Sequence, residues 1–185
     1  MDRKKLLDAA EVLTNLVRNI HLRRELSVVR ADPHLAFWRL IYGDLSDIAV
    51  LEWCKLFGSD DDEHQPLHWK NLVSDQVQFR EALFSRLRIY ESKWRSYWSE
   101  MKRYRDQSVA HHDIRRSEIK NYPKFDLALE SAYFYHEFIV DQIRKMGTDL
   151  KPSDLRQYSK SFAAQCREVA NLAMNATEKF KENVY

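Results

Sequence analysis

The sequence predicts an all-α protein, a single-domain up-and-down helical bundle of about five to six helices with a long central helix. Apolar residues recur every three or four positions over most of the 185 residues, which is the period of an amphipathic helix. The chain contains only 3 Gly and 4 Pro, which leaves little sequence for loops. No stretch alternates between apolar and polar residues, as a half-buried strand would. We therefore expect residues 1–185 to form one helical domain.

Two helices are expected in the first third of the chain. The first carries an apolar stripe that advances by four, three, four and three positions, which keeps its members on one face. These members are Leu6, Ala10, Leu13, Val17 and Ile20. Asp32 followed by Pro33 predicts the start of the second helix, because Asp is a good N-cap and Pro fits the first helical position. This helix extends to about Phe57, and Gly58 is a typical C-terminal stop.

An acidic loop is expected next, over residues 59–68. Its sequence, SDDDEHQPLH, contains a proline and has no helical period. His64 and His68 are four positions apart beside these acids, so a divalent metal site is one interpretation. A solvated loop is the other, and we favour it because Pro66 separates the two histidines. We therefore expect neither a metal site nor a cofactor.

The long central helix is predicted over residues 76–112, with Ser74 or Asp75 as its cap. Its stripe alternates steps of four and three throughout. The members are Leu83, Leu87, Tyr90, Trp94, Tyr97, Met101, Tyr104, Ser108 and His111. One unbroken helix would be about 55 Å long, so the alternative is two collinear helices with a kink near Tyr90. The part of the stripe from Leu83 to Tyr104 is more apolar and aromatic than one groove within the chain needs.

Two more helices complete the bundle. The first carries a stripe from Phe125 to Met146 and ends at Gly147, and Ser153 or Asp154 caps the second. The stripe of the second comprises Phe162, Cys166, Val169, Ala173, Ala176 and Phe180. His136 lies in the first stripe. It is either a core histidine hydrogen-bonded to a neighbour or a partner of a site residue.

Composition favours a soluble protein of the cytoplasm. Hydrophobic residues make up 44% and charged residues 31%, and no run of 18 apolar residues predicts a membrane span. Cys54 and Cys166 lie in apolar stripes, which indicates buried reduced thiols. The net charge of +2 is too small to indicate nucleic-acid binding by itself.

Positive charge is nevertheless concentrated in residues 80–116, which hold ten basic and five acidic residues, a local net charge of +5. Aromatic residues are interleaved with the basic ones, a pattern that suits stacking against single-stranded RNA. The candidate RNA-binding residues are Arg95, Lys102, Arg103, Arg115 and Arg116. The alternatives are a solvated helix face for the charges, and a core or subunit interface for the aromatic rings.

The stretch from Arg105 to His111 combines the residue types that phosphodiester chemistry needs. Arg105 would grip the scissile phosphate, because a guanidinium is a permanent cation that fits phosphate. His111 would take a proton from a ribose 2′-hydroxyl or give one to the leaving oxygen. Asp106 is the third catalytic candidate and would orient a histidine. His112 and Asp113 are auxiliary candidates, and the choice between His111 and His112 stays open.

The segment YRDQSVAHHD resembles the R-x4–6-H motif of the HEPN superfamily. In this resemblance Arg105 is the motif arginine, Asp106 the polar residue that follows it, and His111 the motif histidine. The acidic loop and the stretch 67–71, LHWKN, are similar to the abortive-infection (Abi) branch.

The resemblance implies a homodimer whose two motif helices meet and form a metal-independent endoribonuclease site. The setting would be phage defence, an antiviral role, or a toxin–antitoxin system. The implied partners are RNA, a second copy of the chain, and an antitoxin or regulatory protein, with no membrane. Some members keep the fold and bind RNA or other proteins without cutting, so whether the chain is an enzyme stays open.

Overall fold

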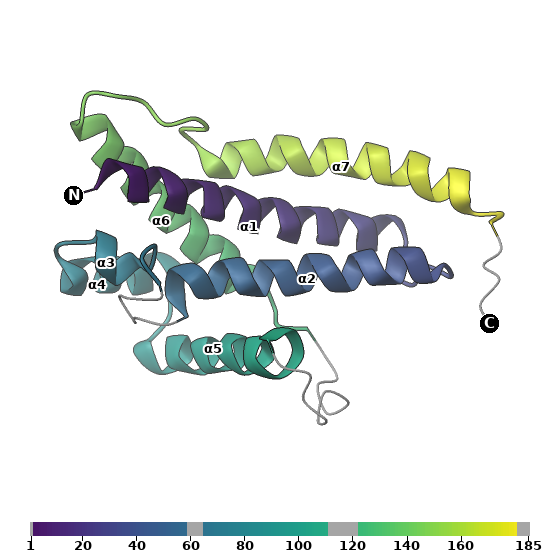
Figure 1. Ribbon diagram of the computed structural model, residues 1–185, viewed down its shortest axis with the longest axis horizontal. Helices are drawn as coiled ribbons and strands as arrows, with labels where there is room; N and C mark the ends of the chain where they lie inside the picture. Colours follow the sequence, from purple (N-terminus) through teal and green to yellow (C-terminus); the bar gives the residue numbers. More distant parts are fainter. Residues whose placement is uncertain (1, 59–64, 111–121, 181–185) are drawn as a thin grey trace.

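The computed structural model describes residues 2–58, 65–110 and 122–180, and all regular structure within them is helical (Figure 1). The longer helices are α1 (Arg3–Val29), α2 (Ala36–Phe57), α5 (Glu91–Tyr104), α6 (Asp126–Lys145) and α7 (Leu155–Thr177). The shorter elements are α3 (Trp69–Leu72), α4 (Gln76–Leu87) and the π-helical η1 (Arg105–Ala110). Along the chain the longer helices alternate in direction (Figure 1). The prediction of an all-α helical bundle is confirmed.

Helix α1 is the centre of the bundle, because it packs against α2, α6 and α7. The sequence dictates this position through the stripe from Leu6 to Ile20, every member of which is buried. Burying a large apolar side chain completely contributes about 1.5–3 kcal/mol. The Asp2 side chain caps the helix by accepting from the backbone N–H groups of Lys4 and Lys5.

The long run of residues 76–104 is divided between α4 and α5, so the prediction of one unbroken helix is wrong and the alternative of two helices with a break near Tyr90 is confirmed. Arg88 adopts the left-handed conformation, with φ 53° and ψ 44°. Its N–H donates to the carbonyl oxygen of Ser85, and the N–H of Ile89 donates to that of Phe84. These two bonds form a Schellman motif, which ends a helix. Glycine usually occupies this position, so an arginine gave no signal in the sequence.

The second helix begins at Ala36, three residues later than the Asp32–Pro33 signal predicts. The N-cap is Leu35, whose backbone is extended and whose side chain is only 3% exposed. Burial of this side chain keeps the connection extended past the proline. The prediction of Gly58 as the end of the helix is confirmed, and a Cβ there would lie 2.8 Å from the Cys54 backbone.

The caps predicted for two later helices are confirmed. Asp75 accepts from the N–H of Gln78 at the start of α4, and Asp154 accepts from that of Gln157 at the start of α7. The stripe predicted for α7 is displaced. Val169 is 64% exposed, whereas Ala170 and Met174 are buried.

Trp53 joins three helices in the core. Its ring centre lies 5.8 Å from that of Trp94 and 5.5 Å from that of Tyr97, which connects α2 to α5. Its indole N–H donates to the Ser131 hydroxyl at 3.1 Å, which connects α2 to α6. A buried tryptophan needs such an acceptor, because an unpaired N–H would cost about 1–3 kcal/mol.

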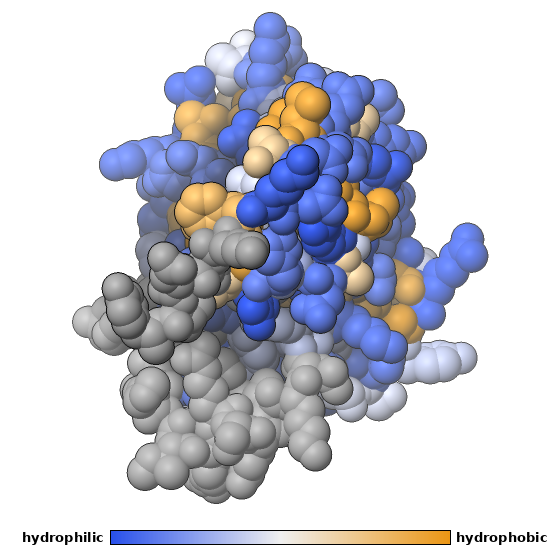
Figure 2. All heavy atoms as spheres, turned by 90° about the vertical axis from the view of Figure 1, so that its right-hand side faces the viewer, coloured by the Kyte–Doolittle hydropathy of each residue, from blue (hydrophilic) through white to orange (hydrophobic). Residues whose placement is uncertain are grey.

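Figure 2 looks at the end of the bundle where α1 ends, α2 begins and α7 ends, and apolar side chains interrupt the polar surface there. Exposed large apolar residues of these elements include Val28, Phe37, Leu40 and Phe180. Among the described residues, no helix is both long enough and apolar enough to cross a membrane.

Candidate functional site

The candidate site begins on α5, which α2 holds against the body of the protein. Tyr97, Met101 and Tyr104 recur at steps of four and three, and all are buried. The Tyr104 hydroxyl donates to the Asp47 carboxylate at 2.6 Å, so the end of α5 is tied to α2 where the motif begins.

The burial of these residues favours one of the two interpretations of the aromatic rings, the core over the subunit interface. Tyr97, Met101 and Tyr104 are at most 6% exposed within one chain. Trp94 and Trp98 are half-buried, and only Tyr90, at 86%, is widely exposed. The aromatic stripe is therefore mainly core, because α2 and α6 already cover it.

The motif segment itself is a π-helical turn, Arg105–Ala110, that continues directly from α5 and packs against α2. π-Helical turns are rare and occur often at functional sites, because a widened turn redirects the residues that follow it. Arg105 and Asp106 open this turn. His111, His112, Asp113, Arg115 and Arg116 lie outside the described residues, so the Arg–His pair stays a prediction.

Arg105 and Asp106 contact each other. The Arg105 Nε and Nη2 atoms lie 2.7 and 2.6 Å from the same oxygen, Asp106 Oδ1. The Arg105 side chain is 22% exposed and that of Asp106 is 49% exposed. The sequence suggested that Asp106 orients a histidine, whereas here it holds the arginine. One edge of the guanidinium is used, and a guanidinium has five N–H donors in all.

Cys54 lies beneath the motif and carries no chemistry of its own. Burial raises the pKa of its thiol to about 12, and the Arg105 charge opposes that shift only partly. The thiol therefore stays protonated near neutral pH and is a poor nucleophile. Both Cys54 and Cys166 are free; Cys54 is buried as predicted, whereas Cys166 is only partly buried.

The three described RNA-binding candidates all lie on α5, in different surroundings. Arg95 donates to Glu91 Oε1 through Nε at 3.0 Å and through Nη2 at 2.7 Å, and this hydrogen bonding lowers the pKa of the Glu91 carboxyl. The Lys102 ammonium lies 4.3 Å from the ring centre of Trp98, a cation–π contact. Arg103 is exposed. Because Arg95 and Lys102 are seven positions apart, they lie on the same side of the helix.

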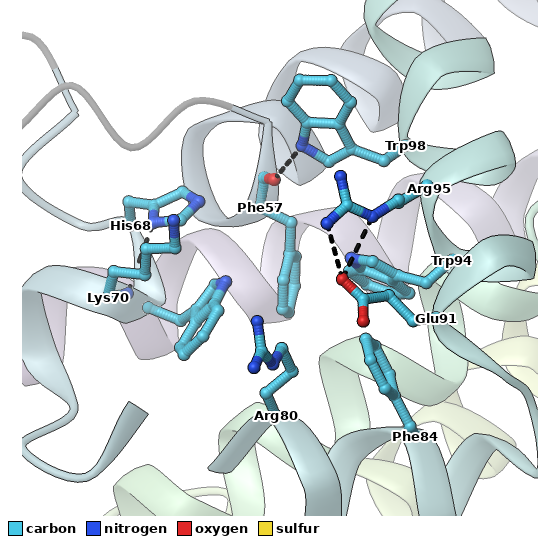
Figure 3. Close-up of a pocket in the computed structure, with 10 residues that line it drawn as sticks. Phe57, His68, Lys70, Arg80, Phe84, Glu91, Trp94, Arg95 and Trp98 are labelled. Atoms are coloured by element: carbon cyan, nitrogen blue, oxygen red, sulfur yellow. Dashed lines mark hydrogen bonds and ion pairs between the residues drawn. The ribbon is translucent and has the colours of Figure 1, made fainter. Parts of the chain in front are cut away.

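A cavity of about 290 Å³ lies at the other end of α5, beside its first turns. The end of α2 and the helices α3, α4 and α5 surround it (Figure 3). Phe57, Phe84, Trp94 and Trp98 supply aromatic walls, and Lys70, Arg80 and Arg95 supply cations. Sequence reasoning missed this cavity. The basic and aromatic residue types were visible, but nothing in their spacing predicts that α3 and α4 approach α5.

His68, the last residue of the predicted loop, helps to shape this cavity and is buried. It is 3% exposed and caps α3, where its Nδ1 accepts from the N–H of Lys70 at 3.3 Å. His64 lies outside the described residues. Within the ranges that the structure describes, no group of three His, Cys, Asp or Glu residues is arranged to hold a metal ion.

His136 is buried in α6, as expected, but the expectation of a hydrogen bond is wrong. Among the described residues neither ring nitrogen has a hydrogen-bond partner. Burial lowers the pKa of the imidazole to about 4, and the negative charge of Asp154 opposes the shift. The ring is therefore neutral at physiological pH, and its position in the core separates it from the motif chemistry.

Comparison with known proteins assigns no family to the chain. No protein-family model, no curated protein and no solved structure matches it.

Proposed function

We propose that this chain is a HEPN-like protein that acts on RNA, and that its homodimer cleaves RNA without a metal ion at the Arg105–His111 motif. The observation that carries the proposal is the π-helical turn Arg105–Ala110, which begins at the motif arginine. Such turns are rare and occur often at functional sites. The turn also follows a helix that displays Arg95, Lys102 and Arg103, the cations that would hold the RNA backbone.

Arg105 is suited to grip a phosphate in this arrangement. Its contacts with Asp106 use Nε and Nη2, which fixes the guanidinium and leaves the Nη1 edge for a phosphate oxygen. A charge held in place before the substrate binds stabilises the charge that develops on the phosphorus oxygens. The Arg105–Asp106 pair is thus a positioning contact in this proposal.

His111 would act as the general base. It takes the proton of a ribose 2′-hydroxyl, the 2′-oxygen forms a bond to phosphorus, and the bond from phosphorus to the 5′-oxygen breaks. A proton returned by a motif histidine neutralises the leaving oxygen. The products are a 2′,3′-cyclic phosphate and a 5′-hydroxyl, with no metal ion in the step. A defence or toxin–antitoxin role, with an antitoxin or regulatory protein as partner, is part of the same proposal.

The deciding experiment incubates the purified protein with mixed RNA in EDTA. We expect cleavage, and 3′ ends that resist polyadenylation until the cyclic phosphate has been opened and removed to leave a free 3′-hydroxyl. Activity that EDTA abolishes and Mg²⁺ restores would contradict the proposal. The same preparation should be a dimer by light scattering at tens of micromolar, and a pure monomer would eliminate the composite site. In such a dimer, the contact between copies would involve surfaces other than the buried stripe of α5.

A second candidate function is RNA binding without cleavage. It is favoured by the state of Arg105, which is ion-paired to Asp106 and only 22% exposed. Under this function the EDTA assay yields no cleavage, but RNA still binds. Arg103→Ala should then weaken binding uniformly across RNA sequences and reduce its salt dependence, because a phosphate contact releases about one counterion.

A further inference from the structure

The cavity beside the first turns of α5 joins flat aromatic walls to a cationic rim. Figure 3 shows Phe57 at its back, with Arg80 and Arg95 pointing into it from opposite sides. Phe57 is 1% exposed, so it forms a rigid floor. Trp98 is held in place because its indole N–H donates to the Phe57 carbonyl oxygen at 2.8 Å. Trp94 packs on Phe57, with ring centres 5.8 Å apart. Such fixed rings suit stacking or edge contact with a flat heterocycle.

Among the residues that the structure describes, the rim carries more basic than acidic side chains. Its described ionisable groups include the cations Lys70, Arg80 and Arg95 and a single carboxylate, Glu91. Glu91 is engaged by Arg95 through one oxygen, Oε1. Arg80 makes no ion pair with a described residue, and it lies on the exposed face of α4 with its guanidinium turned into the cavity (Figure 3). A guanidinium in this position is a natural ligand for a phosphate.

The local fold explains why these groups meet. The ring of Trp69 in α3 stacks on Phe79 of α4, with centres 5.0 Å apart, and this contact sets α3 beside α4. Lys70 follows Trp69 and Arg80 follows Phe79 in the sequence, so one aromatic contact brings both cations to the same rim. Helix α4 then ends at Leu87, and the break before Glu91 lets α5 supply the third cation.

We propose that this cavity binds one nucleoside monophosphate unit, with the base against the aromatic walls and the phosphate on Arg80 and Arg95. The volume of about 290 Å³ lies just below the usual range for ligand sites, roughly 300–1,000 Å³, so the cavity suits no more than one nucleotide. Arg95 lies roughly 14 Å along the helix from Tyr104, so the cavity is separate from the motif. The inference shares Arg95 with the proposed RNA-binding surface, but it requires no cleavage.

Two ligands carry the groups that this site would recognise: a free mononucleotide and the terminal nucleotide of an RNA. Both present a base joined to a phosphate monoester, and the test separates them. A free nucleoside lacks the phosphate, and inorganic phosphate lacks the base. Each should therefore bind more weakly than a mononucleotide.

The test titrates the whole protein with AMP, UMP, adenosine and inorganic phosphate, and follows binding by calorimetry and by tryptophan fluorescence. Trp69, Trp94 and Trp98 line the cavity, so a bound base should change the emission. We expect saturable AMP binding, with adenosine and phosphate each at least about tenfold weaker, a ratio that corresponds to 1.4 kcal/mol. Arg80→Ala should weaken AMP binding about tenfold, and Arg80→Glu should weaken it further.

Arg144→Ala is the matched control, since Arg144 is an exposed helical arginine on α6 that does not line the cavity. It should bind AMP like the parent, and so should Arg105→Ala, which separates this site from the ribonuclease motif. Absence of saturation at millimolar AMP would overturn the proposal. Equal binding of phosphate and AMP, or an unchanged affinity in Arg80→Ala, would do the same.

A final arm uses short RNAs with and without a 5′-phosphate as competitors of AMP. Preferential competition by the phosphorylated RNA supports the site and identifies an RNA end as the source. If neither RNA competes while AMP binds through Arg80, the site is supported with a free nucleotide as the source.

Discussion

At the scale of one residue, His136 shows how a buried side chain can lower the stability of the fold by an amount that depends on pH. Its side chain is fully buried, and among the described residues its two nitrogens have no hydrogen-bond partner. An unpaired buried polar group costs about 1–3 kcal/mol, and a charged one costs more. The folded protein therefore keeps the ring neutral, which is why its pKa falls to about 4.

The consequence is a loss of stability in mild acid. An unfolded histidine has a pKa of about 6.5, so between that value and about 4 the unfolded chain binds a proton that the folded chain does not. The free energy of unfolding should fall by about 2 kcal/mol between about pH 7.5 and pH 5 through His136 alone. His136→Phe should remove this part of the pH dependence, as measured by urea denaturation at both pH values.

His21 adds a smaller effect of the same sign. Burial and the neighbouring Arg24 lower its pKa, so some acid sensitivity should remain in His136→Phe. His34→Phe is the control, because His34 is exposed, and its pH dependence should match that of the parent. An identical loss of stability in His136→Phe and in the parent would show that His136 is not the titrating group.

The motif residues give the second prediction at this scale. If the chain cleaves RNA, Arg105→Ala and His111→Ala should each slow cleavage by ~10²–10⁴-fold while thermal unfolding stays unchanged. Arg105→Lys should rescue poorly, because an ammonium cannot contact both Asp106 and a phosphate through one planar fork. Rates are compared by single-turnover cleavage in EDTA.

His112→Ala decides between the adjacent histidines. It should keep activity if His111 is the motif residue. The reverse result, an active His111→Ala and an inactive His112→Ala, would assign the role to His112. If every variant cuts RNA like the parent, another site or a contaminant is responsible, and the non-catalytic function gains support.

At the scale of the element, the periodicity of the sequence predicted the features that depend on one helix alone. It missed the features that depend on packing between helices. The stripe of α1 was predictable because one helix face is buried along its whole length. The caps Asp75 and Asp154 were predictable because their side chains bond their own backbone. A break near Tyr90 was suggested by the length of the run, but its place at Arg88 was not predictable, because a left-handed arginine lacks the usual glycine signal. The cavity was not predictable either, since it exists only where four separate elements meet.

The break between α4 and α5 leads to a prediction at Arg88. A left-handed residue other than glycine costs roughly 1–2 kcal/mol. Glycine avoids that cost, but it loses more conformational entropy on folding because its unfolded chain is more flexible. Arg88→Gly should therefore stabilise the protein by about 0.5–1 kcal/mol, and Arg88→Val should destabilise it by about 1–2 kcal/mol. Urea midpoints at constant slope measure both changes.

Glu81→Gly is the control, because Glu81 is exposed in the interior of α4. There glycine should cost roughly 1 kcal/mol relative to a good helix former. A loss of similar size in Arg88→Gly would mean that the helix runs straight through Arg88, which is the unbroken alternative.

At the scale of the whole molecule, the apolar core is divided unequally. The larger cluster joins α1, α2, α5 and α6 around Trp53. The smaller cluster contains Leu26, Tyr42, Ala170 and Met174, at the end of the bundle that Figure 2 shows. Tyr42 reinforces this end, since its hydroxyl lies 2.7 Å from the Leu26 carbonyl oxygen and 2.6 Å from that of Arg30.

The unequal division predicts that the two ends open independently. Regions with fewer buried apolar contacts unfold locally at lower free energy, so amides of residues 166–177 should exchange faster than those of residues 128–143. Met174→Ala should accelerate exchange in 166–177 and in the facing residues 22–29 and 36–45, with α5 and α6 unchanged. Leu13→Ala, in the larger cluster, should cost about 2–5 kcal/mol and accelerate exchange throughout. Hydrogen exchange read by mass spectrometry tests both variants, and uniform acceleration by Met174→Ala would show a single cooperative core.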